Sequence, residues 1–119
     1  MKDLEHKEQV KFVQWSKRNT AEHPELWLLF AIPNGGQRHI AVASKLKLEG
    51  VKPGVPDLFL PVARHKRHGL FIEMKRADGG TLSRHQKEWR KRLLAEDYAI
   101  VTCHGFEAAK KVIKYYLSI

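Results

Sequence analysis

Two acidic residues and one lysine occur at positions where a folded chain could bring them together. Asp57 opens one segment of strand-forming residues, and Glu73 and Lys75 lie in a second, 69–76. Because side chains alternate between the two faces of a strand, Glu73 and Lys75 point to the same face, about 7 Å apart. If the two segments pair as an antiparallel hairpin, Asp57 comes close to Glu73. Two neighbouring carboxylates in a partly buried position repel each other unless a positive charge lies between them.

Either Lys75 or a divalent cation could supply that positive charge. Mg²⁺ prefers oxygen ligands, takes only one or two carboxylates, and keeps several waters for a substrate phosphate. Asp57 and Glu73 are therefore candidate metal ligands, with the backbone carbonyl of Met74 as a further one. A bound metal would polarise a phosphodiester and activate a water, and Lys75 would stabilise the charge of the transition state. We expect Mg²⁺ as the cofactor, with Mn²⁺ as a substitute. The competing interpretation is a turn-capping aspartate beside an ordinary surface ion pair.

The elements that must position these residues follow from the apolar pattern and from the turn and cap signals. Helices are expected at 3–18, 39–49, 83–96 (with Ser83 as the N-cap) and 106–117, and strands at 26–32, 57–62, 69–76 and 98–103. Two strands that meet at a loop, followed by a crossover helix, imply a mixed central sheet flanked by helices. The predicted fold class is α/β, in one domain over residues 1–119.

Composition indicates the kind of partner. Lys and Arg number 22 against 13 acids, giving a net charge of +9, which favours a polyanion because neutralising phosphates releases counterions. Charge alone does not distinguish nucleic acid from an anionic membrane surface. The start of the chain lacks the apolar core of a signal peptide, and a single cysteine, Cys103, excludes an internal disulfide. We expect a soluble cytoplasmic protein with no membrane contact.

Several polar and basic side chains are candidates for contact with the backbone of a nucleic acid. Small residues in a turn at 33–36 would let such a backbone approach closely, and a basic loop covers 64–68. The candidates are Asn34, Gly35, Gly36, Gln37, Lys45, Lys47, Lys52, Arg64, Lys66 and Arg67. Each could equally be an ordinary turn or solvated residue. The three tryptophans (Trp15, Trp27 and Trp89) are expected in the core, and His65 and His68 lack the further ligands that a zinc site needs.

The order of these motifs resembles a known nuclease family. Pro56-Asp57 and, after fifteen intervening residues, Glu73-Met74-Lys75 resemble the PD…ExK signature of the restriction-endonuclease-like superfamily. The further matching motifs are Glu8-Gln9 and the segments 32–36, 50–57, 69–75 and 83–86. Together they are similar to the stand-alone VRR-NUC proteins of phages and bacteria. The name-giving Val-Arg-Arg order is absent, and Met74-Lys75-Arg76 takes its place.

This resemblance implies a metal-dependent DNA endonuclease with a restriction-endonuclease-like core. It implies that Asp57 and Glu73 bind the metal, that Lys75 is the catalytic lysine, and that Glu8 and Gln86 complete the site. Glu8 and Gln86 also have structural interpretations, as an acid near a helix N-terminus and as the third residue of a capping box. The resemblance further implies a homodimer that acts like a Holliday-junction resolvase. The alternatives are a nuclease for duplex, flap or single-stranded DNA, or a DNA-binding module without activity. The intact Asp57, Glu73 and Lys75 favour an enzyme.

Overall fold

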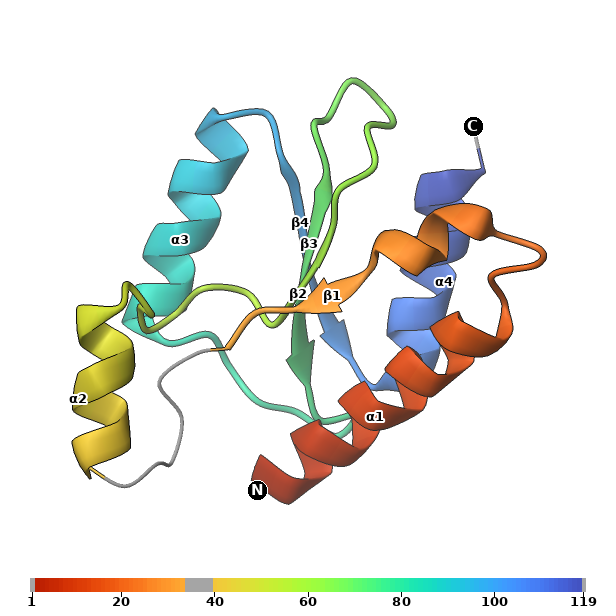
Figure 1. The fold of residues 1–119 in the computed structure, drawn as a ribbon. Helices are drawn as coiled ribbons and strands as arrows, with labels where there is room; N and C mark the ends of the chain where they lie inside the picture. Colours follow the sequence, from red (N-terminus) through yellow and green to blue (C-terminus); the bar gives the residue numbers. More distant parts are fainter. Residues whose placement is uncertain (1, 34–39, 119) are drawn as a thin grey trace.

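The computed structural model describes residues 2–33 and 40–118. Its elements, in chain order, are α1 (Lys2–Arg18), the 3-10 helix η1 (Pro24–Leu28), β1 (Phe30–Ala31), α2 (Ile40–Leu48), β2 (Leu58–Leu60), β3 (Leu70–Lys75), α3 (Arg84–Ala95), β4 (Ala99–His104) and α4 (Phe106–Leu117). Figure 1 shows their arrangement. None of the described helices is long and apolar enough to span a bilayer.

The strands form one mixed sheet in the order β1-β2-β3-β4. β2 pairs antiparallel with both β1 and β3, whereas β4 runs parallel to β3 after the crossover through α3. Parallel neighbours need such a crossover because the chain must return to the same end of the sheet. The predicted α/β class, with a mixed sheet flanked by helices, is confirmed.

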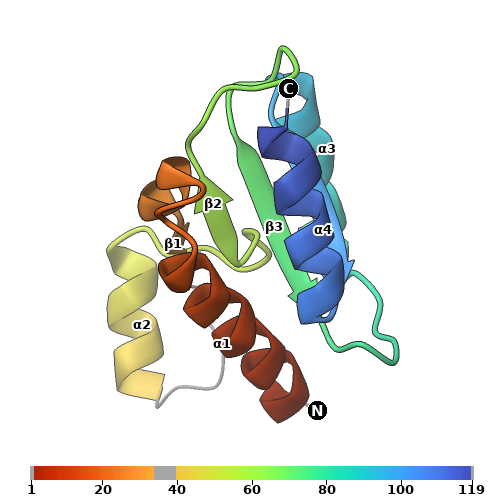
Figure 2. The same ribbon diagram turned by 90° about the vertical axis from the view of Figure 1, so that its right-hand side faces the viewer.

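The helices cover the two faces of the sheet unequally. α1 and α4 pack on one face and α3 lies on the other, beside β4, while α2 stands apart from the sheet (Figures 1 and 2). Leu70, Ile72 and Met74 of β3 point towards α1 and α4, where they join Phe12 and Ile113 in the buried core. Burial of these large apolar side chains is the main favourable contribution to folding. It leaves Phe71, Glu73 and Lys75 on the face that α3 partly covers.

Aromatic side chains fill the part of that face nearest the β2–β3 hairpin. The Phe59 and Phe71 rings stack with their centroids 4.2 Å apart, and Tyr98 meets Phe71 edge-on. Gly69 lies directly under this stack, because a Cβ there would be 2.8 Å from the Phe59 ring. A glycine is thus required where the chain enters β3.

The prediction of one strand over 26–32 is wrong for most of its length. Pro24 begins a 3-10 helix that buries Leu26, and only Phe30–Ala31 form a strand. Proline at the first helical position has its φ preset for a helix, and a short apolar run does not by itself distinguish strand from helix. Trp27 on this turn is 80% exposed, so its predicted place in the core is also wrong.

The other predicted elements are confirmed, with ends shifted by a few residues. The helix predicted over 39–49 is α2, and its stop at Gly50 has a clear physical basis. Gly50 has φ +105°, its N–H donates to the Lys47 carbonyl, and the Val51 N–H donates to the Leu46 carbonyl. This pair of bonds is the Schellman motif that ends many helices at a glycine.

Candidate active site

The pairing of β2 with β3 brings the two predicted carboxylates together. Leu58 pairs with Ile72, so Asp57, which immediately precedes β2, lies opposite Glu73. Asp57 Oδ2 accepts a hydrogen bond of 2.7 Å from the Met74 N–H. The antiparallel contact expected between these two segments is therefore confirmed.

Glu73 and Lys75 are buried, and Gln86 joins them. Their side chains share one face of β3, and the residues are only 5% and 7% exposed. Gln86 Oε1 accepts from Lys75 Nζ at 3.1 Å, and Gln86 Nε2 donates to Glu73 Oε2 at 2.8 Å. The exposed ion pair that was the alternative interpretation is excluded, because neither residue lies at the surface.

The protonation of the two carboxylates reflects their burial. Burial, and after it the negative charge of Asp57, raises the pKa of Glu73 to about 9. Burial also raises the pKa of Asp57, against the hydrogen bond from Met74, which lowers it. A raised pKa in both partners means that the pair retains a proton at neutral pH unless a cation compensates its charge.

The capping box of α3 fixes the orientation of Gln86. The Ser83 N–H donates to Gln86 Oε1 at 2.8 Å, and the Gln86 N–H donates to Ser83 Oγ at 3.1 Å. Because Oε1 accepts from both Ser83 and Lys75, the amide nitrogen must face Glu73. The structural and the functional interpretations of Gln86 are therefore compatible, because the capping box orients its side chain towards Glu73 and Lys75.

A close backbone contact holds the segment before Asp57 against the same helix. Gly54 has φ +85°, and a Cβ there would lie 2.5 Å from the Cβ of His85. The Trp89 Nε1–H donates to the Pro53 carbonyl at 3.1 Å. Only glycine permits this close approach. The contact fixes the position of the segment that carries Asp57 relative to the helix that carries Gln86.

The structure gives Glu8 a partner outside this cluster. Glu8 Oε1 accepts a hydrogen bond of 2.7 Å from the Phe106 N–H, at the N-terminus of α4, and this bond lowers the pKa of Glu8. The N-cap residue of α4, Gly105, has no side chain that could accept such a bond. Glu8 therefore caps α4 from another helix, and its predicted catalytic role stays a prediction.

The acid of α1 whose charge acts on the site is Glu5. After burial, which is the largest cause, the charge of Glu5 makes a minor contribution to the raised pKa of both Asp57 and Glu73. Glu5 was missed from the sequence because it and Glu8, three residues apart, lie on the same face of a helix. Either acid could have faced the sheet, and the spacing alone did not distinguish them.

The donor set fits a hard divalent cation. Among the described residues there is no cluster of three or more histidine, cysteine or acidic side chains. The buried Glu73 and the half-buried Asp57 nevertheless match the one or two carboxylates that Mg²⁺ takes. The Met74 carbonyl as a third ligand stays a prediction.

The basic hairpin predicted to contact DNA lies at the far end of the sheet. His65 and Lys66, both with positive φ, form the tight turn between β2 and β3. Glu73 is six residues along the chain from Arg67, or about 20 Å in an extended strand. Figure 1 shows the hairpin at the top, whereas β3 ends at the bottom.

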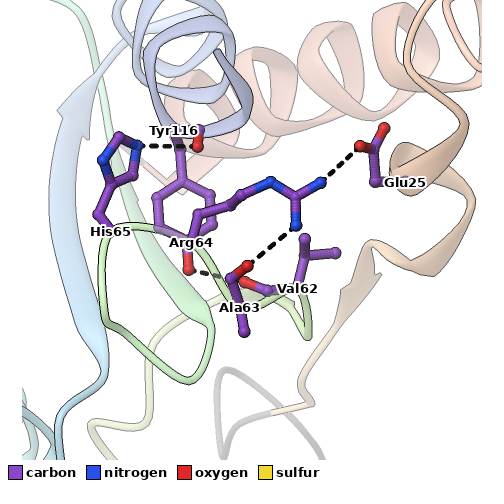
Figure 3. A network of polar contacts seen from close by, with 6 residues as sticks. All are labelled: Glu25, Val62, Ala63, Arg64, His65 and Tyr116. Atoms are coloured by element: carbon purple, nitrogen blue, oxygen red, sulfur yellow. Dashed lines mark hydrogen bonds and ion pairs between the residues drawn. The ribbon is translucent and has the colours of Figure 1, made fainter. Parts of the chain in front are cut away.

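Arg64 of this hairpin makes an ion pair and a hydrogen bond within the protein. Its Nη2 lies 2.7 Å from Glu25 Oε2, and its Nη1 donates to the Ala63 carbonyl at 2.9 Å (Figure 3). His65 Nε2 lies 3.0 Å from the Tyr116 carbonyl, and the Tyr116 hydroxyl donates to the Val62 carbonyl at 2.7 Å. These contacts join the hairpin to η1 and α4 and give Arg64 a structural role.

The remaining candidates for DNA contact are dispersed. Lys45 and Lys47 are exposed on α2, and Lys52 Nζ lies 5.9 Å from the centroid of the Trp89 ring. The four candidates of the preceding turn, Asn34, Gly35, Gly36 and Gln37, lie outside the described residues. The structure brings none of the described candidates of this group into the Asp57–Glu73 cluster.

Comparison with known proteins identifies the family. The VRR-NUC domain family matches residues 2–107. The chain belongs to the VRR-NUC family. A solved structure described as a "VRR_NUC domain protein" is 32% identical, with a TM-score of 0.81, and the match covers 96% of this chain and 88% of that one. Among curated proteins, none matches the chain.

Family membership confirms the resemblance that the ordered motifs indicated. A VRR-NUC domain is a nuclease domain, so the function is of the nuclease type, with DNA as the substrate. The mixed sheet with flanking helices agrees with the fold of the matched structure. The cluster of Asp57, Glu73, Lys75 and Gln86 is the natural candidate for the active site of this nuclease domain.

Proposed function

We propose that this chain is a Mg²⁺-dependent endonuclease that hydrolyses phosphodiester bonds in DNA. The observation that carries the proposal is the pair of facing carboxylates, the half-buried Asp57 and the buried Glu73, with Lys75 on the same strand as Glu73. Strongly perturbed pKa values, such as that of Glu73, cluster at functional sites. The net charge of +9 fits the polyanionic substrate.

Asp57 and Glu73 would hold the metal, with the Met74 carbonyl as a further ligand. When bound, Mg²⁺ would supply polarisation of the phosphodiester and a water of lowered pKa. The carboxylates must lose their proton before they can act as ligands. The affinity of the two carboxylates for a cation should therefore increase as the pH rises towards the raised pKa of Glu73.

Lys75 and Gln86 have separate tasks in this proposal. The Lys75 ammonium, held by Gln86 Oε1 at 3.1 Å, would orient the attacking water and stabilise negative charge that develops on the phosphate. Gln86 would position Glu73 through its amide nitrogen and Lys75 through its oxygen. Burial strengthens each of these electrostatic interactions, because water is excluded and the local dielectric constant is low.

We also propose that the enzyme acts as a homodimer on branched DNA, in the manner of a Holliday-junction resolvase. The family resemblance supports this, together with a physical reason. A symmetric four-way junction needs two cuts, and a two-fold dimer supplies two active sites. The alternatives, a nuclease for duplex, flap or single-stranded DNA and an inactive binding module, are separated from it by the following experiment.

The test is cleavage of end-labelled four-way junction, flap, duplex and single-stranded DNA, each with Mg²⁺, with Mn²⁺ and with chelator. Lys75→Met, which keeps the apolar length of the side chain, is the matched variant. We expect metal-dependent cutting, most rapid on the junction, and a loss of at least about 100-fold in Lys75→Met. Preference for another substrate would overturn the resolvase assignment alone. Binding of DNA without cutting under every condition would overturn the proposed activity.

A further inference from the structure

One flank of α3 is uniformly basic. The helix has five basic residues and a single acid, Glu88. Glu88, one turn from Arg84, lies at the border of this flank and binds Arg92 Nε at 2.6 Å. The basic flank, defined by the i, i+3, i+6 and i+7 spacing of a helix face, comprises Arg84, Lys87, Arg90 and Lys91.

The basic flank is available to a ligand. Arg84, Lys87 and Lys91 are exposed, and within the described parts of the chain none of them has an ion-pair partner within 4.0 Å. Lys91 is near enough to Glu88 to lower its pKa, but Arg92 makes the direct contact. Three exposed cations on one flank without ion-pair partners repel one another, and this arrangement becomes favourable when phosphates lie against it.

The basic flank begins at the active site. Gln86, on the first turn of α3, contacts both Glu73 and Lys75. Arg90, one turn further, lines a small cavity together with Glu73 and Gln86. It also lines an open groove of about 510 Å³ that runs past Gly80 and His104 along the edge strand β4. Arg90 therefore lies between the candidate catalytic cluster and a groove open to solvent.

Acidic residues at the C-terminal end of α3 mark the end of the surface that can bind a phosphate. Glu96 is the C-cap residue and Asp97 follows it, both exposed. Two carboxylates together with the negative end of the helix dipole disfavour a phosphate there. The favourable surface thus covers the first two turns of α3, which are the turns nearest the site.

We propose that the basic flank of α3, and not the β2–β3 hairpin, holds the phosphate backbone of the DNA strand next to the bond that is cut. This inference rests on the proposed function, since the ligand is the DNA substrate. Lys and Arg contacts of this kind position a nucleic acid without reading its sequence. The expected consequence is a loss of affinity and a smaller salt dependence when these charges are removed, for any DNA sequence.

The test compares two double variants that remove the same charge from exposed lysines on helices. Lys87→Gln/Lys91→Gln changes the basic flank, and Lys111→Gln/Lys114→Gln changes α4, on the opposite face of the sheet. Lys66→Gln tests the hairpin. Binding of labelled four-way junction and duplex DNA is measured by fluorescence anisotropy in chelator, from about 50 to 200 mM salt, and thermal unfolding checks the fold.

We expect the α3 variant to bind at least about tenfold more weakly than the wild type, with the slope of log K against log salt reduced by about 2. The α4 variant and Lys66→Gln should change affinity by less than about threefold, which is the general effect of a lower net charge. Equal weakening by the α3 and α4 variants, or a larger effect of Lys66→Gln, would overturn the inference.

Cleavage measured on the same proteins separates this inference from the proposed function. If the wild type binds DNA but does not cut it with metal, while the α3 variant alone loses affinity, the proposed activity fails and the phosphate site stands. If the wild type cuts DNA and the α3 variant binds normally, the phosphate site fails and the activity stands. A wild-type protein that does not bind DNA at all would overturn both.

Discussion

At Glu73, burial determines the state of a residue that would be ionised on a surface. Its pKa is raised to about 9 from an ordinary value of 4.5, first by burial and then by the charge of Asp57. Glu73 Oε2 accepts a hydrogen bond of 2.8 Å from Gln86 Nε2. Burying an acid in this state costs folding free energy. The same acid is a good ligand for a cation that can displace its proton.

The stability of the metal-free protein should therefore fall as the pH rises from 4.5 to 9. In this range the folded state binds more protons at Glu73 than the unfolded state, so the free energy of unfolding decreases with pH. Glu73→Gln resembles the protonated side chain and should remove this dependence. At pH 8 in chelator, we expect the variant to melt at a higher temperature than the wild type. The difference should be several degrees for each kcal/mol by which the free energy of unfolding increases.

Thermal unfolding of both proteins from pH 5 to 9, in chelator and with excess Mg²⁺, measures this effect. Mg²⁺ should stabilise the wild type increasingly as the pH rises and leave Glu73→Gln almost unchanged. If the melting temperatures of the two proteins run parallel across the whole pH range, Glu73 is not protonated in the folded state.

At the scale of elements, α1 and α4 are joined by a hydrogen bond between a side chain and a helix end. Glu8 on α1 accepts from the Phe106 N–H because Gly105, at the cap position, cannot do so itself. A carboxylate at a helix N-terminus satisfies a free donor and interacts well with the helix dipole. Glu5, on the same face of α1, instead acts on Asp57 and Glu73.

We expect Glu8→Ala and Glu5→Gln to have different effects. Loss of the cap in Glu8→Ala should lower the free energy of unfolding by about 1 kcal/mol, with cleavage activity within about threefold of the wild type. Glu5→Gln should change stability by less than about 0.5 kcal/mol. It should raise the Mg²⁺ concentration for half-maximal cleavage, because a negative charge near the metal is lost.

Chemical denaturation and Mg²⁺ titrations of cleavage on the two variants provide the measurement. A Glu8→Ala protein that is as stable as the wild type but inactive would give Glu8 the catalytic role that the family resemblance implies. It would also remove the structural role that we assign to Glu8 here.

The sequence predicts some elements well because their signals are local. Alternation in 69–76 places Glu73 and Lys75 on one face, and Ser83 and Gln86 form the expected capping box. The run at 26–32 was misassigned, since an apolar stretch with a proline just before it fits a strand or a short helix equally. The roles of Glu5 and Glu8 depend on the rotation of α1 against the sheet, which local pattern does not determine.

At the scale of the whole molecule, the topology of the sheet decides which charges can act at the site. β3 lies between β2 and β4, so its last residues have Asp57 on one side and β4 on the other, and the crossover helix α3 contacts them through Gln86. The hairpin is at the opposite end of the same strand. A basic loop is conspicuous in the sequence, but only the folded topology shows that Arg64 pairs with Glu25 and that Gln86, on the helix that carries the basic flank, contacts Glu73.

The central claim is that Asp57 and Glu73 together form the metal site of this nuclease. The most direct test is calorimetric titration of Mn²⁺ into the metal-free wild type, Asp57→Asn and Glu73→Gln at pH 8, with Glu8→Gln as a control outside the cluster. We predict one site per chain in the wild type and in Glu8→Gln, and a loss of at least about tenfold in affinity in each of the other two variants. Unchanged Mn²⁺ affinity in both Asp57→Asn and Glu73→Gln would contradict the claim.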